Sequence, residues 1–272
     1  MRDSAKRSRL LEPVRRAAGH PRLLTATALA LRARTVVGST AFVARELTGR
    51  GGTFAYPVRG MAHLSVLVRH GSGDPVTLGE VFHERDYEPP SDLQAMAPRR
   101  IVDLGANVGY FGAFALGRWP SSTVTALEPD PANADVHARV IALNELQDRW
   151  ELRRAAAAAR NGELRFNASA DALSSVSESG ALVVPAEDVL ELVSGADLLK
   201  MDVEGGEWEI LDDPRLGLDP PAVVVLEHHP EGAPGPDPHA AALERLAAAG
   251  LTRSATIFTR DDGYGMVWAW RP

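Results

Sequence analysis

The chain has 272 residues, of which 45% are hydrophobic and 24% are charged, a composition typical of a globular protein with one sizeable domain. It contains no cysteine, which excludes disulfide scaffolds, thiolate zinc sites and cysteine nucleophiles. The net charge of −7 is uneven, because residues 1–50 hold 11 basic and 3 acidic residues while the remainder is strongly acidic. An acidic body is a poor surface for a phosphate backbone, so we do not expect nucleic acid as a partner.

The basic N-terminus raises the question of a targeting segment. Arg15-Arg16 and the apolar stretch 23–31 are similar to a twin-arginine signal, but Arg32 and Arg34 interrupt the stretch and no cleavage site follows. No run approaches the roughly 18 apolar residues that a transmembrane segment needs. We therefore predict a soluble, cytoplasmic protein whose basic N-terminus forms a solvated helical face or contacts an anionic surface.

Residues 1–98 are predicted to form an N-terminal appendage of helices and short strands. Apolar residues recur at three- and four-residue spacing, which indicates helices over residues 21–34 and 39–47. Short β-like runs follow at residues 53–58, 63–68 and 76–82, and a proline-rich linker ends the segment. Three roles stay open for this appendage: a lid, a substrate-binding segment, or a contact between the subunits of a homo-oligomer.

Residues 99–272 are predicted to form a second domain in which strands and helices alternate. The expected strands are residues 101–104, 123–127, 151–155, 163–167, 196–203, 222–227, 254–259 and 266–270. The expected helices are residues 110–118, 131–143, 186–193, 238–249 and one that opens at 207–211. This alternation implies an α/β fold with a doubly wound, mostly parallel sheet, and the last two strands form an antiparallel hairpin at its C-terminal end.

The segment VDLGANVGYF (residues 102–111) leads from the first of these strands into a helix. Gly105 and Gly109 let the backbone approach a ligand where a side chain would collide, and Asp103 can engage an ammonium or hydroxyl group. Ligands of open α/β sheets bind outside the carboxyl ends of the strands. The spacing is not the G-x-G-x-x-G of dinucleotide-binding proteins but D-x-G-x-N-x-G, which favours an S-adenosylmethionine (SAM) enzyme.

A second feature of the predicted cofactor site is Glu128, which ends the next strand. An acidic residue about 20 positions after a glycine loop can accept hydrogen bonds from both hydroxyls of a cofactor ribose. Pro129 and Asp130 follow it and open a helix. The glycine loop and Glu128, in this order, predict a cofactor site and not a purely structural turn.

Between residues 101 and 227 the sequence resembles the FkbM-type SAM-dependent methyltransferases. The resemblance rests on VDLGANVGYF (102–111), LEPDPAN (127–133) and above all DLLKMDVEGGEWEIL (197–211). It implies a Rossmann-like class I methyltransferase fold with a seven-stranded sheet, and O-methylation of a hydroxyl on a small molecule, either a secondary metabolite or a sugar. The loop pattern and the resemblance together assign these residues to SAM: Asp103, Gly105, Ala106, Asn107, Gly109, Tyr110, Glu128, Pro129 and Asp130.

The reacting end of the site is expected after the fourth and fifth parallel strands. Methyl transfer needs an acceptor oxygen held in line with the sulfonium methyl and help with proton loss. Asp202 is the first candidate for this base, and His228 is the second because an unperturbed histidine titrates near neutral pH. Lys200 alternates with Asp202 along the strand, so it either assists ionisation of a hydroxyl or forms a buried pair that braces the strand end.

Carboxylates after these two strands also raise the question of a metal. Asp202 and Glu227 could supply oxygen ligands to Mg²⁺, but two carboxylates are too few to define a site, and metal dependence stays open. Glu204 is interpreted either as a site residue or as a cap of the following helix. Glu207 is assigned to the packing of that helix, and His229 is ranked below His228.

The leading hypothesis is therefore a SAM-dependent O-methyltransferase that acts on a small-molecule hydroxyl. Three alternatives stay open. The acceptor is a protein or a glycan; the chain is an NAD(P)-dependent oxidoreductase, which the glycine spacing disfavours; or it is a catalytically silent SAM-binding protein, which the intact loop disfavours.

Overall fold

The computed structural model of the chain describes residues 28–49, 51–61, 63–167, 175–176 and 182–272. The twin-arginine-like stretch and the first part of the predicted helix 21–34 lie outside these residues, and residues 28–33 are helical. In the part of the chain described, no helix is both long and apolar enough to cross a membrane.

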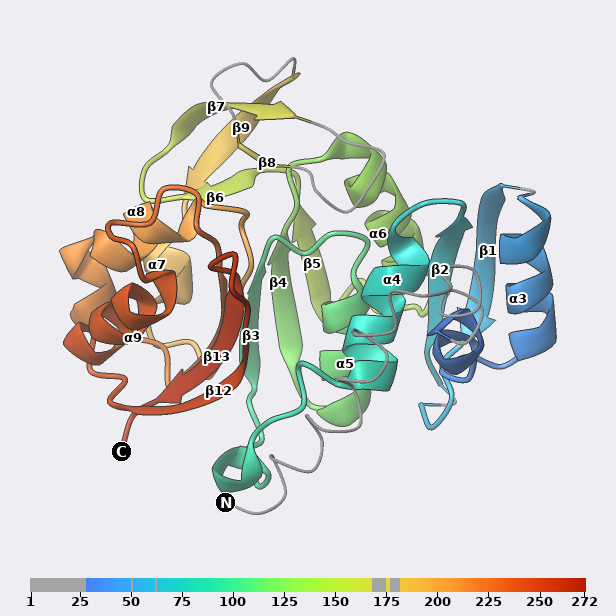
Figure 1. The fold of residues 1–272 in the computed structure, drawn as a ribbon, viewed down its shortest axis with the longest axis horizontal. Helices are drawn as coiled ribbons and strands as arrows, with labels where there is room; N and C mark the ends of the chain where they lie inside the picture. The colour runs from blue at the N-terminus through green and yellow to red at the C-terminus, as the bar shows by residue number, and fades with distance from the viewer. Residues whose placement is uncertain (1–27, 50, 62, 168–174, 177–181) are drawn as a thin grey trace.

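The centre of the molecule is a seven-stranded sheet in the order β12-β13-β11-β10-β3-β4-β5 (Figure 1). Its strands are β3 (Arg100–Leu104), β4 (Thr123–Leu127), β5 (Trp150–Arg153), β10 (Leu198–Met201), β11 (Val223–His228), β12 (Arg253–Thr259) and β13 (Gly265–Trp270). The five strands from β11 to β5 pair in parallel, whereas β13 is antiparallel to both β11 and β12. The predicted Rossmann-like sheet with a C-terminal antiparallel hairpin is thus confirmed.

Helices cover both faces of this sheet, because its parallel strands are apolar on both sides. Along β3, Ile101 faces one core, while Val102 and Leu104 face the other. The first core is covered by α5 (Tyr110–Arg118) and α6 (Pro131–Leu143), and the second by α7 (Leu190–Val193), α8 (Glu207–Asp212), the 3₁₀ turn η3 (Pro214–Gly217) and α9 (Pro238–Ala248).

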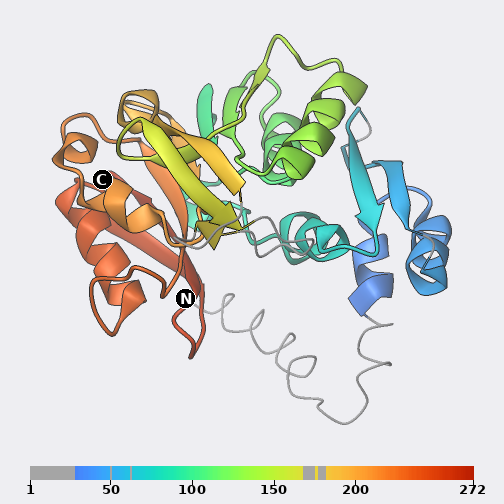
Figure 2. The same cartoon turned by 90° about the horizontal axis from the view of Figure 1, so that it is seen from above.

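Residues 39–84 of the N-terminal part pack against α5 and α6, on the side of the molecule away from the hairpin β12–β13 (Figures 1 and 2), whereas residues 90–92 lie beside that hairpin. The elements of the N-terminal part are α3 (Ser39–Thr48), the antiparallel pair β1 (Gly52–Pro57) and β2 (Ser65–His70), α4 (Asp74–Gly79), the π-helical turn η1 (Glu80–Glu84) and the 3₁₀ turn η2 (Ser91–Leu93). Val66 and Val68 of β2 belong to the same hydrophobic core as Tyr110 and Phe114 of α5. The N-terminal part is therefore continuous in packing with the central sheet.

Two predicted elements are wrong in type. Residues 76–82, expected as a strand, lie in α4 and η1. Pro75 sits in the first turn of α4, where it costs no hydrogen bond, and Leu78 and Val81 are buried at helical spacing. Residues 186–188, expected as helix, belong to strand β9 (Leu182–Asp188), and only Leu190–Val193 is helical.

Strand β9 is part of a second sheet, of four strands in the order β6-β9-β7-β8, which lies at one end of the central sheet (Figure 1). The other strands are β6 (Ala156–Ala158), β7 (Gly162–Asn167) and β8 (Ser175–Val176). Only the strand at 163–167 was expected from the sequence. β9 pairs with β6 on one side and β7 on the other, so pairing between distant segments overrides the local helical pattern at residues 186–188.

Candidate functional site

The main pocket of the described structure lies where β3, β4, β10 and β11 end. Its empty volume is about 1200 Å³ when the solvent at its open mouth is counted. Its lining comes from the whole length of the described chain: Thr77, Glu80, Tyr87, Gly105, Asn107, Glu128, Pro129, Asn133, Ala156, Ala157, Asp202, Val203, Glu204, Glu227, His229, Arg260 and Tyr264. The pocket therefore joins the carboxyl ends of the parallel strands to residues of the N-terminal part and of the turn between β12 and β13.

The glycine loop forms one wall of this pocket. Gly105 has a φ of 75°, and a Cβ there would lie 1.7 Å from the backbone oxygen of Asp202. Gly109 has a φ of 89°, and a Cβ there would lie 2.6 Å from the His137 ring. Both positions need glycine on two grounds, the left-handed backbone and the close neighbour. The loop consequently packs directly against the strand end that carries Asp202.

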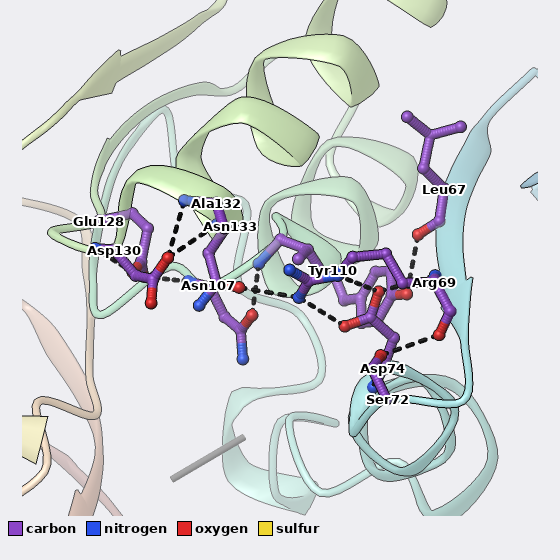
Figure 3. A network of polar contacts seen from close by, with 11 residues as sticks. Leu67, Arg69, Ser72, Asp74, Asn107, Tyr110, Glu128, Asp130, Ala132 and Asn133 are labelled. Carbon is purple, nitrogen blue, oxygen red and sulfur yellow. Dashed lines mark hydrogen bonds and ion pairs between the residues drawn. The ribbon is translucent and has the colours of Figure 1, made fainter. Parts of the chain in front are cut away.

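Glu128 is buried beneath the loop and lines the pocket. One carboxylate oxygen accepts a hydrogen bond from the Asn107 amide at 2.7 Å, and the other accepts from the Asp130 amide at 2.8 Å (Figure 3). Burial raises the pKa of Glu128 to about 7, although these two amide donors lower it in part. Each oxygen keeps a free lone pair that could accept from a ligand hydroxyl.

The remaining residues predicted to hold the cofactor divide into two groups. Gly105, Asn107 and Pro129 line the pocket with Glu128. Ala106, Gly109, Tyr110 and Asp130 do not line it, and they support the loop and the helix behind it. Asp130 caps α6 by accepting from the amides of Ala132 and Asn133, and the Tyr110 hydroxyl donates to the backbone oxygen of Leu67 at 2.8 Å (Figure 3).

Asp103 has a different position from the one predicted. Its side chain is completely buried and is not part of the pocket lining; it lies 3.4 Å from the ammonium of Lys200. The structure pairs Asp103 with a cation of the protein, because the side chain at this point of β3 lies next to Lys200 of β10.

Lys200 is enclosed between the glycine loop and the end of β10. Its ammonium donates to the backbone oxygen of Gly105 at 2.6 Å and lies 3.5 Å from the Asp202 carboxylate. Burial lowers the pKa of Lys200, but the carboxylates of Asp103 and Asp202 outweigh this and raise it above its usual value. Lys200 does not line the pocket, so its geometry is that of a bracing residue, one of the two roles predicted for it.

Of the two adjacent histidines at the end of β11, only the second lines the pocket. His228 is completely buried, faces His239 at 3.1 Å and does not line the pocket. His229, ranked lower, does line it. His228 is the last residue of β11 and pairs with Gly265, and successive side chains alternate across a strand. Of these two histidines, only His229 is therefore placed to contact a ligand in the pocket.

His229 is surrounded by carboxylates. Its Nδ1 lies 3.1 Å from Glu207, and its Nε2 lies 3.4 Å from Glu204 and 3.7 Å from Asp202. Burial lowers the pKa of His229, but the hydrogen bond that it donates to Glu207 and the charges of Asp202 and Glu204 raise it to about 9. Without a further cation, this imidazole holds a proton at neutral pH.

Glu204 and Glu207 also differ from expectation. Glu204 has a φ of 52° and lines the pocket, while the side chain that accepts from the Gly205 amide belongs to Glu207. Of the predicted metal pair, Asp202 falls in a group of potential ligands, and its partners there are Glu204 and His229 in place of Glu227. Glu227 lines the pocket nearby, and burial, followed by the charge of Asp202, raises its pKa to about 8.

The N-terminal part completes the pocket with Thr77, Glu80 and Tyr87. Arg69 fixes this part in place, since its guanidinium donates to both Asp74 and the side-chain oxygen of Asn133, each at 2.7 Å (Figure 3). On another side, Ala156 and Ala157 of β6 contribute apolar surface. The sequence analysis missed these five lining residues, because no local motif marks them.

The chain is similar to known methyltransferases in sequence and in fold. The family model described as "Methyltransferase FkbM domain" matches residues 103–250. The structure of methyltransferase FkbM from Methylobacillus flagellatus KT is similar with a TM-score of 0.50 and 12% identity, over 90% of this chain and 58% of that one. No curated protein matches the chain.

Two further solved structures show lower similarity. The M. jannaschii protein TYW2, in complex with AdoMet, has a TM-score of 0.45 and 14% identity, over 81% of this chain and 87% of that one. An O-methyltransferase family protein from Burkholderia thailandensis has a TM-score of 0.44 and 12% identity, over 72% and 57%.

Proposed function

The chain belongs to the FkbM methyltransferase family, and on that premise we propose that it transfers the methyl group of SAM to a hydroxyl group of a small molecule. The observation that carries the proposal is the two-ended pocket. One end holds the glycine loop and Glu128, and the other holds Asp202, His229 and Glu227.

In the proposed arrangement, the ribose hydroxyls of SAM donate to Glu128, and the adenine lies against Pro129, Ala156 and Ala157. The basis for this is chemical: Glu128 keeps free lone pairs, and the two alanines offer an apolar wall for an aromatic ring. The methionine part then passes Gly105, whose missing side chain leaves room for it. This route directs the sulfonium methyl toward Asp202.

The acceptor is proposed to enter between Asp202 and the side chains of Glu80, Tyr87 and Glu227. Its hydroxyl oxygen attacks the methyl carbon in line, the carbon–sulfur bond breaks, and SAM becomes the thioether S-adenosylhomocysteine. The hydroxyl proton passes to Asp202, a half-buried carboxylate at the pocket surface. Lys200 holds that carboxylate and the glycine loop at once, so it is a positioning residue in this scheme.

An acceptor with several hydroxyls suits this end of the pocket. The carboxylates of Glu80, Asp202 and Glu227 are hydrogen-bond acceptors, and hydroxyl groups can donate to each of them. We also propose that residues up to 98 choose the acceptor, because Thr77, Glu80 and Tyr87 of that segment line the pocket.

The test is transfer of labelled methyl from SAM to a panel of polyhydroxylated small molecules, with protein and glycan acceptors alongside. We expect label on a small-molecule oxygen, and loss of transfer in Asp202→Asn. The variant Glu209→Gln, which changes an exposed carboxylate on α8, is the control. Transfer to a protein or glycan alone, or to nitrogen, would contradict the proposed acceptor class.

A further inference from the structure

The side chains of Asp202, Glu204 and His229 converge at one edge of the pocket. Their potential ligand atoms, two carboxylate oxygens and an imidazole nitrogen, all lie within 4.8 Å of one another. Ligands at about 2.0–2.2 Å from one cation lie roughly 3.0–3.6 Å apart in tetrahedral or octahedral geometry. The 3.4 Å from His229 Nε2 to Glu204 is already in that range, and the 3.7 Å to Asp202 is close to it.

Glu207 prepares the histidine for such a role. It is completely buried and accepts hydrogen bonds from the His229 amide at 2.7 Å and the Gly205 amide at 2.9 Å. Its third contact is His229 Nδ1 at 3.1 Å, and an ionised carboxylate there requires Nδ1 to be the donor. The lone pair of a neutral His229 is then on Nε2, which points at Asp202 and Glu204. Metal-binding histidines almost always donate their other ring N–H in this way.

Nothing else in the described part of the chain satisfies Nε2. His229 is only 2% exposed, and among the described residues Nε2 has no hydrogen bond, only the two carboxylates at 3.4 and 3.7 Å. A ring nitrogen that faces two carboxylates at the edge of a pocket carries either a proton or a cation between them.

The charge of the pocket favours a cation. Five acidic residues, Glu80, Glu128, Asp202, Glu204 and Glu227, line it, and Arg260 is the one lysine or arginine among its lining residues in the described chain. A bound divalent ion would balance the charges of its two carboxylate ligands, Asp202 and Glu204. A mixed set of one imidazole and two carboxylates suits Mn²⁺ or Zn²⁺ better than Mg²⁺, which prefers oxygen ligands.

We propose that Asp202, Glu204 and His229 bind one divalent transition-metal ion, and that Glu207 orients His229 for it. The inference rests on the proposed function in one respect: the open coordination positions face the pocket, where the hydroxyl oxygen of the acceptor would bind. Glu227 is left outside the ligand set, in contrast to the Asp202–Glu227 pair expected from the sequence.

The experiment is a titration of EDTA-treated, desalted protein with Mn²⁺. The electron paramagnetic resonance signal of free Mn²⁺ measures how much ion is bound, and added Zn²⁺ tests for competition at the same site. We expect one ion per chain. Glu204→Gln and His229→Asn should weaken binding at least tenfold, and Glu207→Gln about 10–100-fold, the usual effect of removing the partner of a ligand. The control Glu209→Gln, on the same helix as Glu207 but exposed, should bind as the wild type does.

Titration of each variant with S-adenosylhomocysteine separates the possible results. Retained S-adenosylhomocysteine binding shows that a variant is folded, so its loss of Mn²⁺ is a loss of the site. If the wild type binds S-adenosylhomocysteine but neither Mn²⁺ nor Zn²⁺, or if Glu204→Gln and His229→Asn bind the ion as tightly as the wild type, the metal site is overturned and the proposed function stands. If Mn²⁺ binds and S-adenosylhomocysteine does not, the proposed function fails instead.

Discussion

Replacing Lys200 by Met removes the cation that links the glycine loop to the reacting end of the pocket. The Lys200 side chain is 4% exposed and its partner Asp103 is fully buried, so the substitution leaves a buried carboxylate without a counter-charge. Breaking a buried pair in this way costs about 3–5 kcal/mol, a large share of the roughly 5–15 kcal/mol that stabilises a typical protein. The double variant Lys200→Met/Asp103→Leu removes both charges, and we expect it to recover most of the loss.

Urea unfolding followed by circular dichroism measures this effect. With a slope of about 1–3 kcal/mol per molar urea, Lys200→Met should lower the midpoint by at least about 1 M. The matched control is Arg154→Met, which breaks the exposed pair Arg154–Asp135 and should cost at most about 1 kcal/mol. If Lys200→Met is no more destabilising than Arg154→Met, or if the double variant is less stable than Lys200→Met, the bracing role of Lys200 is refuted.

Three further predictions concern the loop, the cofactor end and the reacting end. Gly105→Ala should weaken S-adenosylhomocysteine binding at least tenfold, because the added Cβ would lie 1.7 Å from the backbone oxygen of Asp202. The control is Gly60→Ala: Gly60 has a similar positive φ, but no atom lies near its added Cβ, so binding should be unchanged. Affinity for S-adenosylhomocysteine should fall about tenfold from pH 8 to pH 6, because the pKa of Glu128 is about 7 and only the ionised carboxylate accepts from both ribose hydroxyls. An affinity that does not change with pH would show that Glu128 does not titrate in this range. The same raised pKa means that Glu128 binds a proton more tightly in the folded state, so its contribution to stability declines as pH rises from about 4.5 through 7. Asp202→Asn should lower turnover about 10²–10⁴-fold and change S-adenosylhomocysteine affinity only a few-fold; turnover near that of the wild type would remove Asp202 as the base.

The sequence identifies four residues that line one end of this pocket, Gly105, Asn107, Glu128 and Pro129, because their signals are local. The Gly105 and Gly109 spacing marks a turn with a left-handed backbone, and Glu128 follows a recognisable strand. Both features depend on a few neighbouring residues and on the edge of the sheet where parallel strands end. The fold follows from the same alternation of strands and helices.

The sequence does not show which side chains line the reacting end, because a shift of one residue along the chain changes which side chain enters the pocket. His228 and His229 are adjacent, and which of them enters the pocket depends on where β11 stops alternating against β13. Glu204 and Glu207 lie three residues apart around a left-handed turn, and only the fold shows that Glu204 faces Nε2 of His229 while Glu207 faces Nδ1.

Other lining residues arise from contacts between distant segments. Ala156 and Ala157 sit in an alanine run that has no strand signal, and they form β6 only by pairing with β9. Arg69 links Asp74, also in the N-terminal part, to Asn133 of α6. Glu80 and Tyr87, from the same part of the chain, line the pocket. No pattern within either segment reports these contacts.

The central claim is that the Gly105–Glu128 end of the pocket binds the methyl donor, and isothermal titration with S-adenosylhomocysteine tests it most directly. We predict binding at micromolar concentration to the wild type and to the exposed-carboxylate control Glu209→Ala, a clear loss of affinity in Glu128→Ala, and no binding of NAD(P). Absence of binding to the folded wild type, or an affinity that Glu128→Ala leaves unchanged, would contradict this placement of the cofactor.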